Sequence, residues 1–330
     1  MNRVIRWGIL GTGKIAKAFA AALADTPDAE LVAVASRTAD SADTFGAQFG
    51  VARCHASYQA LADDDQVDVI YIATPHPMHH ENALMCLNGG KAILVEKSFT
   101  MNRRQAEDII ALARQKNLFV MEAMWTRFMP AVVEAKRIVD SGEIGPAVHV
   151  SADFGFTADA GPEHRLFNPE LGGGALLDLG IYPLSMSSYF LGAVEAVQAS
   201  AQMGPTGVDV QTAFSLLHAG GGVSACACSL RARTPTELTI SGSKGFLRLH
   251  DRFHNTEEIS VTLVDGTSRS SRTITLPHIG NGYAHEAIEV GRCLRAGLIE
   301  SPVMPHDETL SIMGTLDAIR AQIGLRYGAD

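Results

Sequence analysis

Two pairs of side chains in this sequence have the chemistry of an acid–base site. Glu96 and Lys97 directly follow the apolar run 92–95, and Asp178 and Tyr182 are spaced i, i+4 in an apolar stretch. A free phenol has a pKa near ~10, but a neighbouring ammonium group lowers that pKa and lets a tyrosinate accept a proton near neutral pH. Tyr182 beside Lys97 could therefore deprotonate a hydroxyl group whose carbon gives up a hydride. In a plainer interpretation, Lys97 only ends a strand in solvent, and Asp178 and Tyr182 are hydrogen-bonded core groups.

The elements that would position these residues begin with a nucleotide-binding motif. Residues 4–10 form an almost continuous apolar run, typical of a strand buried on both faces, and Gly11-Thr12-Gly13-Lys14-Ile15-Ala16 follows at once. In this pattern Gly11 makes a tight turn, Gly13 lets the backbone approach a pyrophosphate, and Ala16 allows close helix packing. The motif alone is weakly specific, but a strand precedes it and a predicted helix follows it. We therefore predict a dinucleotide site here.

The end of the second predicted strand, residues 30–36, bears on the choice between NAD and NADP. An enzyme that binds NAD is expected to carry Asp or Glu here for the ribose 2′-hydroxyl group, whereas this chain has Ser36 and Arg37. A guanidinium group suits the 2′-phosphate of NADP. Arg37 could instead be an ordinary solvated loop residue. The sequence favours NADP as the cofactor over NAD.

Three histidines follow the next apolar run, residues 67–73. His76, His79 and His80 stand at the start of a predicted helix, but no Cys, Asp or Glu completes a ligand set, so no metal site is predicted. His79 is expected near the cofactor or as a polar residue of the helix start. The alternation of strands and helices predicts a Rossmann fold with a doubly wound parallel sheet over residues 1–123. Ligands bind at the carboxyl ends of such strands, where Glu96 and Lys97 would lie.

Residues 124–330 are predicted to form an α+β domain for substrate binding and dimerisation. From residue 147 the pattern changes to strands joined by tight turns, which predicts an open, largely antiparallel sheet, followed by helices at 283–296 and 307–323. An uncovered sheet face is a natural contact surface, so a homodimer through this sheet is expected. The predicted strands are residues 148–154, 193–203, 208–217, 222–231, 236–241, 246–250, 259–264 and 272–276.

Composition limits the partners and the location. The chain has 330 residues and a formal charge of −9. An acidic surface disfavours nucleic acid and anionic membranes, so a small-molecule ligand is expected. Five cysteines without a C-x-x-C pair indicate neither a disulfide framework nor a zinc site. This cysteine pattern predicts a reducing cytoplasm, and no run reaches the ~18 apolar residues of a membrane span.

These motifs together resemble the glucose-fructose oxidoreductase / inositol dehydrogenase (Gfo/Idh/MocA) family over essentially the whole chain. The family's Glu-Lys-Pro signature appears as Glu96-Lys97-Ser98, with serine in place of proline. Its Asp-x-x-x-His helix motif appears as Asp178-Leu179-Gly180-Ile181-Tyr182, with tyrosine in place of histidine. This tyrosine is accompanied by the segment Glu122-Ala123-Met124-Trp125-Thr126-Arg127-Phe128. In both features the chain resembles the branch of the family that contains dimeric dihydrodiol dehydrogenases and NADP-dependent D-xylose 1-dehydrogenases.

The resemblance implies cofactor contacts throughout the chain. Trp125 and Arg127 would border the site, and Arg165 would reach the cofactor phosphates, although His164 stands where the family often has Trp. Thr74, Pro75 and His79 would lie near the nicotinamide. The full set of predicted cofactor contacts is Gly11, Thr12, Gly13, Lys14, Ile15, Ser36, Arg37, Thr74, Pro75, His76, His79, Glu96, Lys97, Trp125, Arg127 and Arg165.

The resemblance also implies a reaction. Lys97, Asp178 and Tyr182 are the predicted catalytic residues and substrate contacts, and Phe154 either forms a wall of the substrate pocket or belongs to the core. The expected activity is NADP-dependent hydride transfer between a hydroxyl-bearing carbon of a cyclic polyol or sugar and the nicotinamide, with a pyranose such as D-xylose preferred over a trans-dihydrodiol. The alternative is a non-catalytic NADP-binding regulator. The presence of all three catalytic residues weighs against that alternative.

Overall fold

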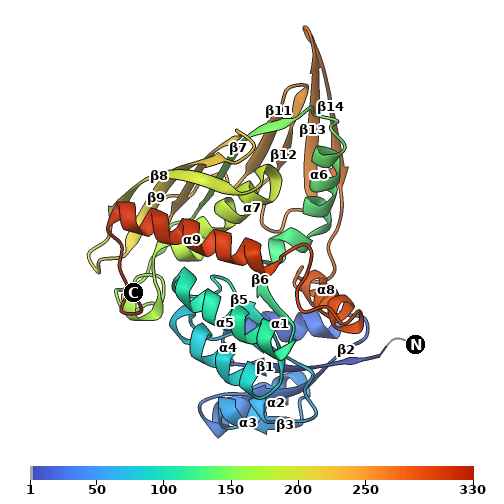
Figure 1. Cartoon of the computed structure of the whole chain (residues 1–330), viewed down its shortest axis with the longest axis vertical. Helices are drawn as coiled ribbons and strands as arrows, with labels where there is room; N and C mark the ends of the chain where they lie inside the picture. The colour runs from blue at the N-terminus through green and yellow to red at the C-terminus, as the bar shows by residue number, and fades with distance from the viewer. Residues whose placement is uncertain (1–2) are drawn as a thin grey trace. The chain divides into compact units, whose positions relative to one another are not determined.

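The computed structural model describes residues 3–330, which form two compact units. The first unit contains the chain up to Trp125 together with Ile279–Leu310, and the second contains Thr126–His278 together with Ser311–Asp330. The chain therefore returns to the first unit after building most of the second. Figure 1 labels most of the helices and strands of both units.

The first unit is built on a six-stranded sheet in the order β3-β2-β1-β4-β5-β6, with all neighbours parallel. This confirms the predicted Rossmann fold. The order reverses between β1 and β4, the point at which such sheets bind ligands. Its strands are β1 (Ile5–Leu10), β2 (Ala29–Ala35), β3 (Arg53–His55), β4 (Val69–Ile72), β5 (Ala92–Glu96) and β6 (Val120–Ala123). Its helices are α1 (Lys14–Ala24), α2 (Ala39–Phe49), α3 (Tyr58–Ala62), α4 (His79–Asn88), α5 (Arg103–Lys116) and α8 (Ala284–Arg295), with a short 3-10 turn at His76–Met78.

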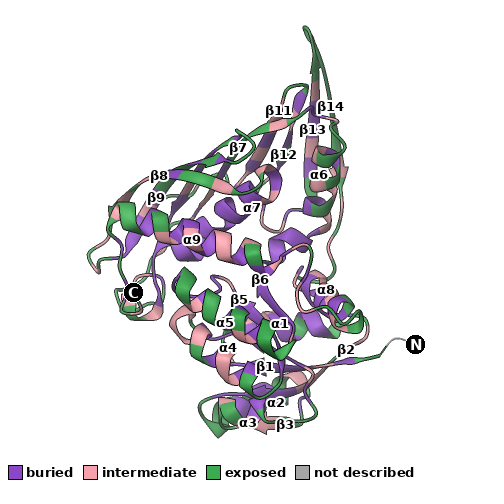
Figure 2. Cartoon of the chain, viewed as in Figure 1, coloured by how far each residue is buried: buried purple, intermediate pink, exposed green. Residues whose placement is uncertain are grey.

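Burial explains why the central strands of this sheet read as continuous apolar runs. Every residue of β4 and β5 is buried, so both faces of each strand are covered. Figure 2 colours the buried residues of the chain purple. Such a strand needs apolar side chains at each position and not only at alternate positions. Glu96 is therefore the exception that ends a strand of four apolar residues.

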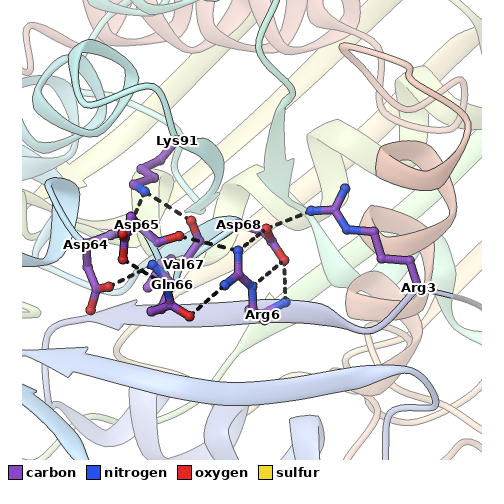
Figure 3. A network of polar contacts seen from close by, with 8 residues as sticks. All are labelled: Arg3, Arg6, Asp64, Asp65, Gln66, Val67, Asp68 and Lys91. Carbon is purple, nitrogen blue, oxygen red and sulfur yellow. Dashed lines mark hydrogen bonds and ion pairs between the residues drawn. The ribbon is translucent and has the colours of Figure 1, made fainter.

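Charged residues at the amino ends of the strands form the polar network of Figure 3. The carboxylate of Asp68 binds the guanidinium groups of Arg3 at 2.7 Å and Arg6 at 3.0 Å. The ammonium group of Lys91 donates to the backbone oxygens of Asp64 and Val67. Because Asp64–Asp68 precede β4 and Lys91 precedes β5, these contacts fix the loop at the edge of the sheet opposite the carboxyl ends.

The carboxylate of Asp64 is the buried centre of that loop. Burial opposes its ionisation, but hydrogen bonds from Arg53, Gln66 and His55 hold its pKa well below the ordinary value. Arg53 supplies two of these bonds, both at 2.7 Å. A buried carboxylate that is satisfied in this way stabilises the native loop geometry.

The second unit is built on an eight-stranded sheet in the order β14-β13-β12-β11-β7-β10-β9-β8. All neighbours are antiparallel except β7 and β10, which confirms the predicted open, largely antiparallel sheet. Its strands are β7 (Ala147–Gly155), β8 (Val194–Met203), β9 (Asp209–His218), β10 (Val223–Ser229), β11 (Leu238–Gly242), β12 (Gly245–Leu249), β13 (Glu258–Asp265) and β14 (Ser268–Thr275). The helices are α6 (Pro130–Asp140), α7 (Ile181–Leu191) and α9 (His306–Ile323), whose last part belongs to this unit.

The two faces of this sheet differ in composition. On the buried face, Val150, Phe214 and Cys226 pack with α7 and the turn that precedes it. On the other face, Ser151, Ser215 and Ala225 lie side by side in register across β7, β10 and β9 and are exposed. The alternation seen in the sequence therefore separates an apolar face from a face of small, largely polar residues.

Candidate functional site

The glycine loop after β1 has the geometry that a dinucleotide requires. Gly11 has φ +109°, and a Cβ there would lie 3.0 Å from the backbone oxygen of Ala73, so only glycine fits the turn. Gly13 is the N-cap of α1 and has no side chain to cap the helix, and a Cβ there would meet nothing within 4 Å. The backbone at Gly13 is therefore open to an approaching pyrophosphate, a group that helix N-termini bind through their first amides. Thr12, Lys14 and Ile15 continue this loop into the helix.

The residues predicted to select NADP lie beside that loop. The amide of Gly11 donates to the backbone oxygen of Ala35 at the end of β2, one residue before Ser36. Ser36 is buried, whereas Arg37 is exposed. Thr38 caps α2 through a 3.4 Å hydrogen bond from the amide of Ser41. The Arg37 side chain therefore starts from the carboxyl edge of the sheet, next to the dinucleotide loop, with no acidic residue at 36–38.

His79 joins two loops at the carboxyl edge of the sheet. Its Nε2 lies 2.8 Å from the oxygen of Thr74, and its Nδ1 lies 2.9 Å from the oxygen of Ser98. The side chain is fully buried, and this burial lowers the pKa of the imidazole. Since both ring nitrogens face backbone oxygens, His79 positions the two loops around Lys97. His76 also reaches this segment, with Nε2 3.1 Å from the oxygen of Lys97. Pro75, between Thr74 and His76, is exposed.

Glu96 anchors the backbone of Lys97. Its carboxylate accepts a hydrogen bond from the hydroxyl group of Tyr71 and another from the amide of Lys97 at 3.1 Å. Tyr71 is fully buried, and burial together with the charge of Glu96 raises the pKa of its phenol. The peptide bond from Lys97 to Ser98 is cis. The hydrogen bond to Glu96 holds the backbone of Lys97. Lys97 as a residue is only partly buried, so solvent reaches part of it.

A second buried carboxyl group, Glu286 of α8, lies near Glu96 and escapes detection from the sequence motifs. It is fully buried, and neither of its carboxylate oxygens has a hydrogen-bond partner within residues 3–330. Burial and the charge of Glu96 raise the pKa of Glu286 well above its usual range. Two neighbouring buried carboxyls do not both ionise readily. Since Glu96 accepts two hydrogen bonds, Glu286 is the neutral member of the pair.

In the second unit, two rings lie beside the predicted base, Tyr182. The rings of Phe154 and Tyr182 are 5.4 Å apart, and the imidazole of His254 stacks on Phe154 at 4.5 Å with an interplanar angle of 13°. His254 also lies 5.6 Å from the Tyr182 ring. Phe154 packs in addition against the core cluster that contains Leu230, as the core interpretation of this residue expects. His254 belongs to a loop without a recognisable motif, which is why the sequence did not indicate it.

Asp178 lies in the same unit and is paired with Arg165. The guanidinium of Arg165 contacts both carboxylate oxygens, at 3.1 and 3.4 Å. Residues 176–180 form one π-helical turn, and α7 begins at Ile181, so Asp178 and Tyr182 do not share a regular α-helix. No motif in the sequence indicates this wider turn.

Trp125 and Arg127 are held by different units. In the first unit, the ring of Trp125 stacks on Tyr283 at 4.2 Å. In the second, Arg127 is buried and donates to the hydroxyl group of Ser185 at 3.0 Å and to its backbone oxygen at 2.7 Å. The guanidinium of Arg127 therefore helps to fix α7.

Across residues 3–330, no three His, Cys, Asp or Glu side chains converge in a way that could hold a metal ion. Over the same range, no helix combines the length and hydropathy needed to cross a membrane. The five cysteines are all free thiols.

Comparison with known families decides the identity of the fold. A family model described as "Oxidoreductase family, NAD-binding Rossmann fold" matches residues 5–124, and a model of the GFO/IDH/MocA C-terminal domain matches residues 132–248. The chain belongs to the GFO/IDH/MocA oxidoreductase family. This membership confirms the resemblance seen in the sequence and makes the protein an NAD(P)-dependent oxidoreductase.

Relatives within the GFO/IDH/MocA family align with nearly the whole chain. Trans-1,2-dihydrobenzene-1,2-diol dehydrogenase of Danio rerio is 35% identical over 336 residues, which cover 99% of each chain. D-xylose 1-dehydrogenase (NADP(+)) of Hypocrea jecorina is 33% identical and covers 98% of this chain and 93% of its own. Among solved structures, a 3-ketoreductase from Actinomadura kijaniata in complex with NADP and TDP-benzene is 27% identical, with a TM-score of 0.85 and coverage of 97% and 98%.

Proposed function

We propose that this protein is an NADP-dependent dehydrogenase that oxidises a hydroxyl-bearing carbon of a cyclic polyol. The preferred substrate class is a pyranose such as D-xylose, oxidised at its anomeric carbon. The observation that carries the proposal is the setting of Tyr182, a buried phenol beside two aromatic rings in the unit that also contains the Arg165–Asp178 pair. Family membership and the D-xylose dehydrogenase relative support it.

The cofactor is NADP. Arg37 stands at the end of β2 where an enzyme specific for NAD would carry an acid, and a guanidinium binds a phosphate through charge-assisted hydrogen bonds. Two relatives agree with this choice, since one is named for NADP and another was crystallised with it. Gly11, Gly13 and the amides that open α1 would hold the pyrophosphate.

The chain's own residues supply the acid–base chemistry. NADP, when bound, would supply the acceptor for the hydride. Tyr182, as the phenolate, takes the proton of the substrate hydroxyl group, and the ammonium group of Lys97 stabilises that phenolate. Asp178, held by Arg165, accepts a hydrogen bond from a second substrate hydroxyl and orients the ring. The proton and the hydride thus leave the same C–OH group, which becomes a carbonyl group.

A trans-dihydrodiol is the second candidate substrate. The Danio rerio relative carries that activity in its name. The parallel pair of Phe154 and His254 presents a flat apolar face, which suits either the C–H face of a pyranose or a cyclohexadiene ring. A non-catalytic NADP-binding regulator is less well supported, because such a protein needs neither Lys97 nor Tyr182.

The proposal also covers the roles of the two parts of the chain and their assembly into a homodimer. Residues 1–123 bind the cofactor, and residues 124–330 bind the substrate and form a homodimer in the cytoplasm. The exposed face of the second sheet supports this assembly. It contains a shallow depression of about 590 Å³ between β7, β8, β9 and β10, and the paired residues Leu217 and Val223 are 43% and 44% exposed on the same face.

A spectroscopic assay tests the activity directly. Purified protein is mixed with NADP or NAD and a panel of pentoses, hexoses and trans-diols, and the absorbance of the reduced nicotinamide is followed. We expect turnover with NADP and a pyranose. NADP binding without turnover on any member of the panel would overturn the enzymatic proposal in favour of a regulator.

A further inference from the structure

A single strand holds both ends of the helical segment that carries Asp178 and Tyr182. At the start of β9, the carboxylate of Asp209 accepts a 2.8 Å hydrogen bond from the amide of Leu176, the first residue of the segment. At the end of β9, Nδ1 of His218 donates to the backbone oxygen of Gly192, the residue after α7, at 2.8 Å. The two contacts fix the segment at opposite ends.

Asp209 acts as a helix cap supplied from outside the helix. The amides of the first turn of a helix lack intrahelical partners, and Ser, Thr, Asp or Asn normally satisfies one of them. Residues 172–175 are Gly-Gly-Gly-Ala and have no side chain for this purpose. Asp209 is fully buried, which raises the pKa of its carboxyl, while hydrogen bonds from Thr212 and Leu176 oppose that rise. The bond from the hydroxyl group of Thr212 is 2.6 Å long.

The glycine loop before the segment is shaped to fit between Asp209 and Tyr327. Gly174 has φ +124°, and a Cβ at this position would collide with Oδ1 of Asp209 and lie 3.1 Å from the hydroxyl oxygen of Tyr327. That hydroxyl group donates to the backbone oxygen of Gly173 at 2.5 Å. The guanidinium of Arg320 lies over the Tyr327 ring, 4.9 Å from its centre. The glycines therefore approach the chain's own residues closely.

The same loop also determines where Arg165 lies. The amides of Gly173 and Gly174 donate to the backbone oxygens of Asn168 and Leu166, at 3.0 and 2.9 Å. Leu166 follows Arg165, the partner of Asp178. A shift of the glycine loop would therefore move both members of the Arg165–Asp178 pair.

The π-helical turn begins at the residue that Asp209 caps. It spans Leu176–Gly180 and contains Asp178, and Tyr182 follows in the first turn of α7. Turns of this kind inside helices are frequent at functional sites, because they change the direction of the side chains that follow. We infer that Asp209 and Tyr327 are positioning residues for the reaction, which fix the start of this turn and thereby the placement of Asp178 and Tyr182. This inference rests on the proposed function of those two residues.

The test compares the two ends of the same strand. Asp209→Ala removes the contact at the Asp178 end, and His218→Ala is the matched control at the far end. Turnover is expressed per NADPH-binding site, counted by fluorescence titration, so that loss of folded protein is not mistaken for slow chemistry. We expect Asp209→Ala to lower kcat per site by about 10- to 100-fold, the scale of an ångström-sized misplacement, with the affinity for NADPH unchanged. His218→Ala should lower Tm but keep kcat per site within about twofold of wild type, because the Asp178 end remains capped.

Two milder variants keep the test decisive if Asp209→Ala fails to fold. Asp209→Asn retains an acceptor oxygen for the amide of Leu176 and should recover most of the turnover. Tyr327→Phe removes only the hydroxyl group that binds Gly173 and should lower kcat per site several-fold. Wild-type kcat per site in both Asp209→Ala and Tyr327→Phe, or an equal loss in His218→Ala, would overturn the inference.

Tyr182→Phe separates this inference from the proposed mechanism. If Tyr182→Phe keeps wild-type turnover, the assignment of Tyr182 as the base is wrong, whatever Asp209 does. If Tyr182→Phe is inactive while Asp209→Ala and Tyr327→Phe turn over normally, the mechanism stands and only the positioning role fails.

Discussion

The guanidinium of Arg165 holds the carboxylate of Asp178 through two contacts, at 3.1 and 3.4 Å. Sequence resemblance assigned Arg165 to the cofactor phosphates, and the structure shows what else the same group can do. Asp178 is almost fully buried, so removing Arg165 would take a charged contact away from a poorly solvated carboxylate and hold its side chain less firmly. Orientation of the substrate should suffer first.

Substitution of Arg165 should therefore act mainly on the KM for the polyol. We expect Arg165→Ala to raise that KM roughly five- to tenfold, a modest effect because the arginine is 58% exposed and solvent screens the pair. Arg165→Lys keeps the positive charge but lacks the planar guanidinium group, so its KM for the polyol should lie between those of the wild type and Arg165→Ala. Steady-state kinetics with both substrates measures this. A large loss of NADP affinity with an unchanged polyol KM would instead support the phosphate role.

Tyr182→Phe should leave NADP binding intact and lower turnover by about 10²- to 10⁴-fold, the usual cost of a lost general acid–base group. Tyr189→Phe removes a phenol hydroxyl from the same helix and serves as the control. Lys97→Met should be at least as damaging as Tyr182→Phe, because it removes the charge that stabilises the phenolate. In the wild type, oxidation should accelerate as pH rises through the pKa of Tyr182. Wild-type turnover in Tyr182→Phe, with the same pH profile, would transfer the role of base to another residue.

Arg37→Asp should reverse or flatten the preference for NADP. Each charge-assisted hydrogen bond to the 2′-phosphate contributes on the order of 1.5–3 kcal/mol, and an acid at this position would accept the ribose hydroxyl group of NAD instead. The ratio of kcat/KM for NADP and NAD is the measurement. Arg104→Asp makes the same charge change at an exposed position of α5 and should leave the ratio unaltered. An unchanged ratio in Arg37→Asp would show that Arg37 does not contact the phosphate.

Glu286→Gln should stabilise the protein at alkaline pH. The pKa of Glu286 is raised in the folded state, so the wild type loses stability as pH increases from the ordinary carboxyl pKa near ~4.3 toward the raised value. Glutamine has the same shape and no charge to bury. We expect the difference in the free energy of unfolding between Glu286→Gln and the wild type to be about 1–3 kcal/mol more favourable at pH 8 than at pH 5. Urea titration at the two pH values measures this difference.

Glu289→Gln on the same helix is a control that should change the free energy of unfolding in the opposite direction. Burial works against ionisation of Glu289, but hydrogen bonds from Arg292, Ser301 and Cys293 lower its pKa overall. The stability that it contributes is present above the ordinary carboxyl pKa and is lost as pH falls toward the lowered value. Glu289→Gln should therefore destabilise the protein at pH 8, with a smaller effect in acid. The same sign for both variants would contradict the charge states assigned to α8.

Ala225→Arg should prevent dimer formation. Ala225 lies between Ser151 and Ser215 on the exposed face of the second sheet, and a buried arginine there would be unpaired. Light scattering at micromolar concentration should give a dimer mass for the wild type and a monomer mass for the variant. Ala219→Arg, in the turn beyond β9, is the control and should remain dimeric. A monomeric wild type would rule out this assembly.

Much of the fold could be predicted because the burial of each strand determines how apolar residues are spaced along it. Val69–Ile72 is apolar throughout since both of its faces are covered, whereas Phe214 and Leu216 alternate with exposed Ser215 since one face of β9 is covered. These two patterns separate a parallel from an antiparallel sheet. β14 begins at Ser268 and not at the predicted residue 272, because residues 268–271 pair with β13 without an apolar alternation.

The candidate site was only partly predictable, because many of its contacts join residues that are distant in sequence. Glu96, Lys97, Asp178 and Tyr182 have local motifs that can be recognised. Glu286 comes from a segment that returns to the first unit, and its only signal is an acid on the otherwise apolar side of α8. His254 and Asp209 have no local signal at all, since a stacked ring and a remote helix cap depend on strand pairing that the sequence does not specify.

The network of Arg6, Asp68 and Lys91 lies at the amino ends of the strands. Its position allows substitutions that change the cofactor to occur independently of substitutions that change the stability of the domain. The charges that hold the first sheet together lie at one edge of it, and the residues proposed to choose the cofactor lie at the other. Substitutions far apart without shared partners have additive effects on stability. A lineage could therefore exchange Arg37 for an acid, and NADP for NAD, while the folding of the domain remained under separate selection.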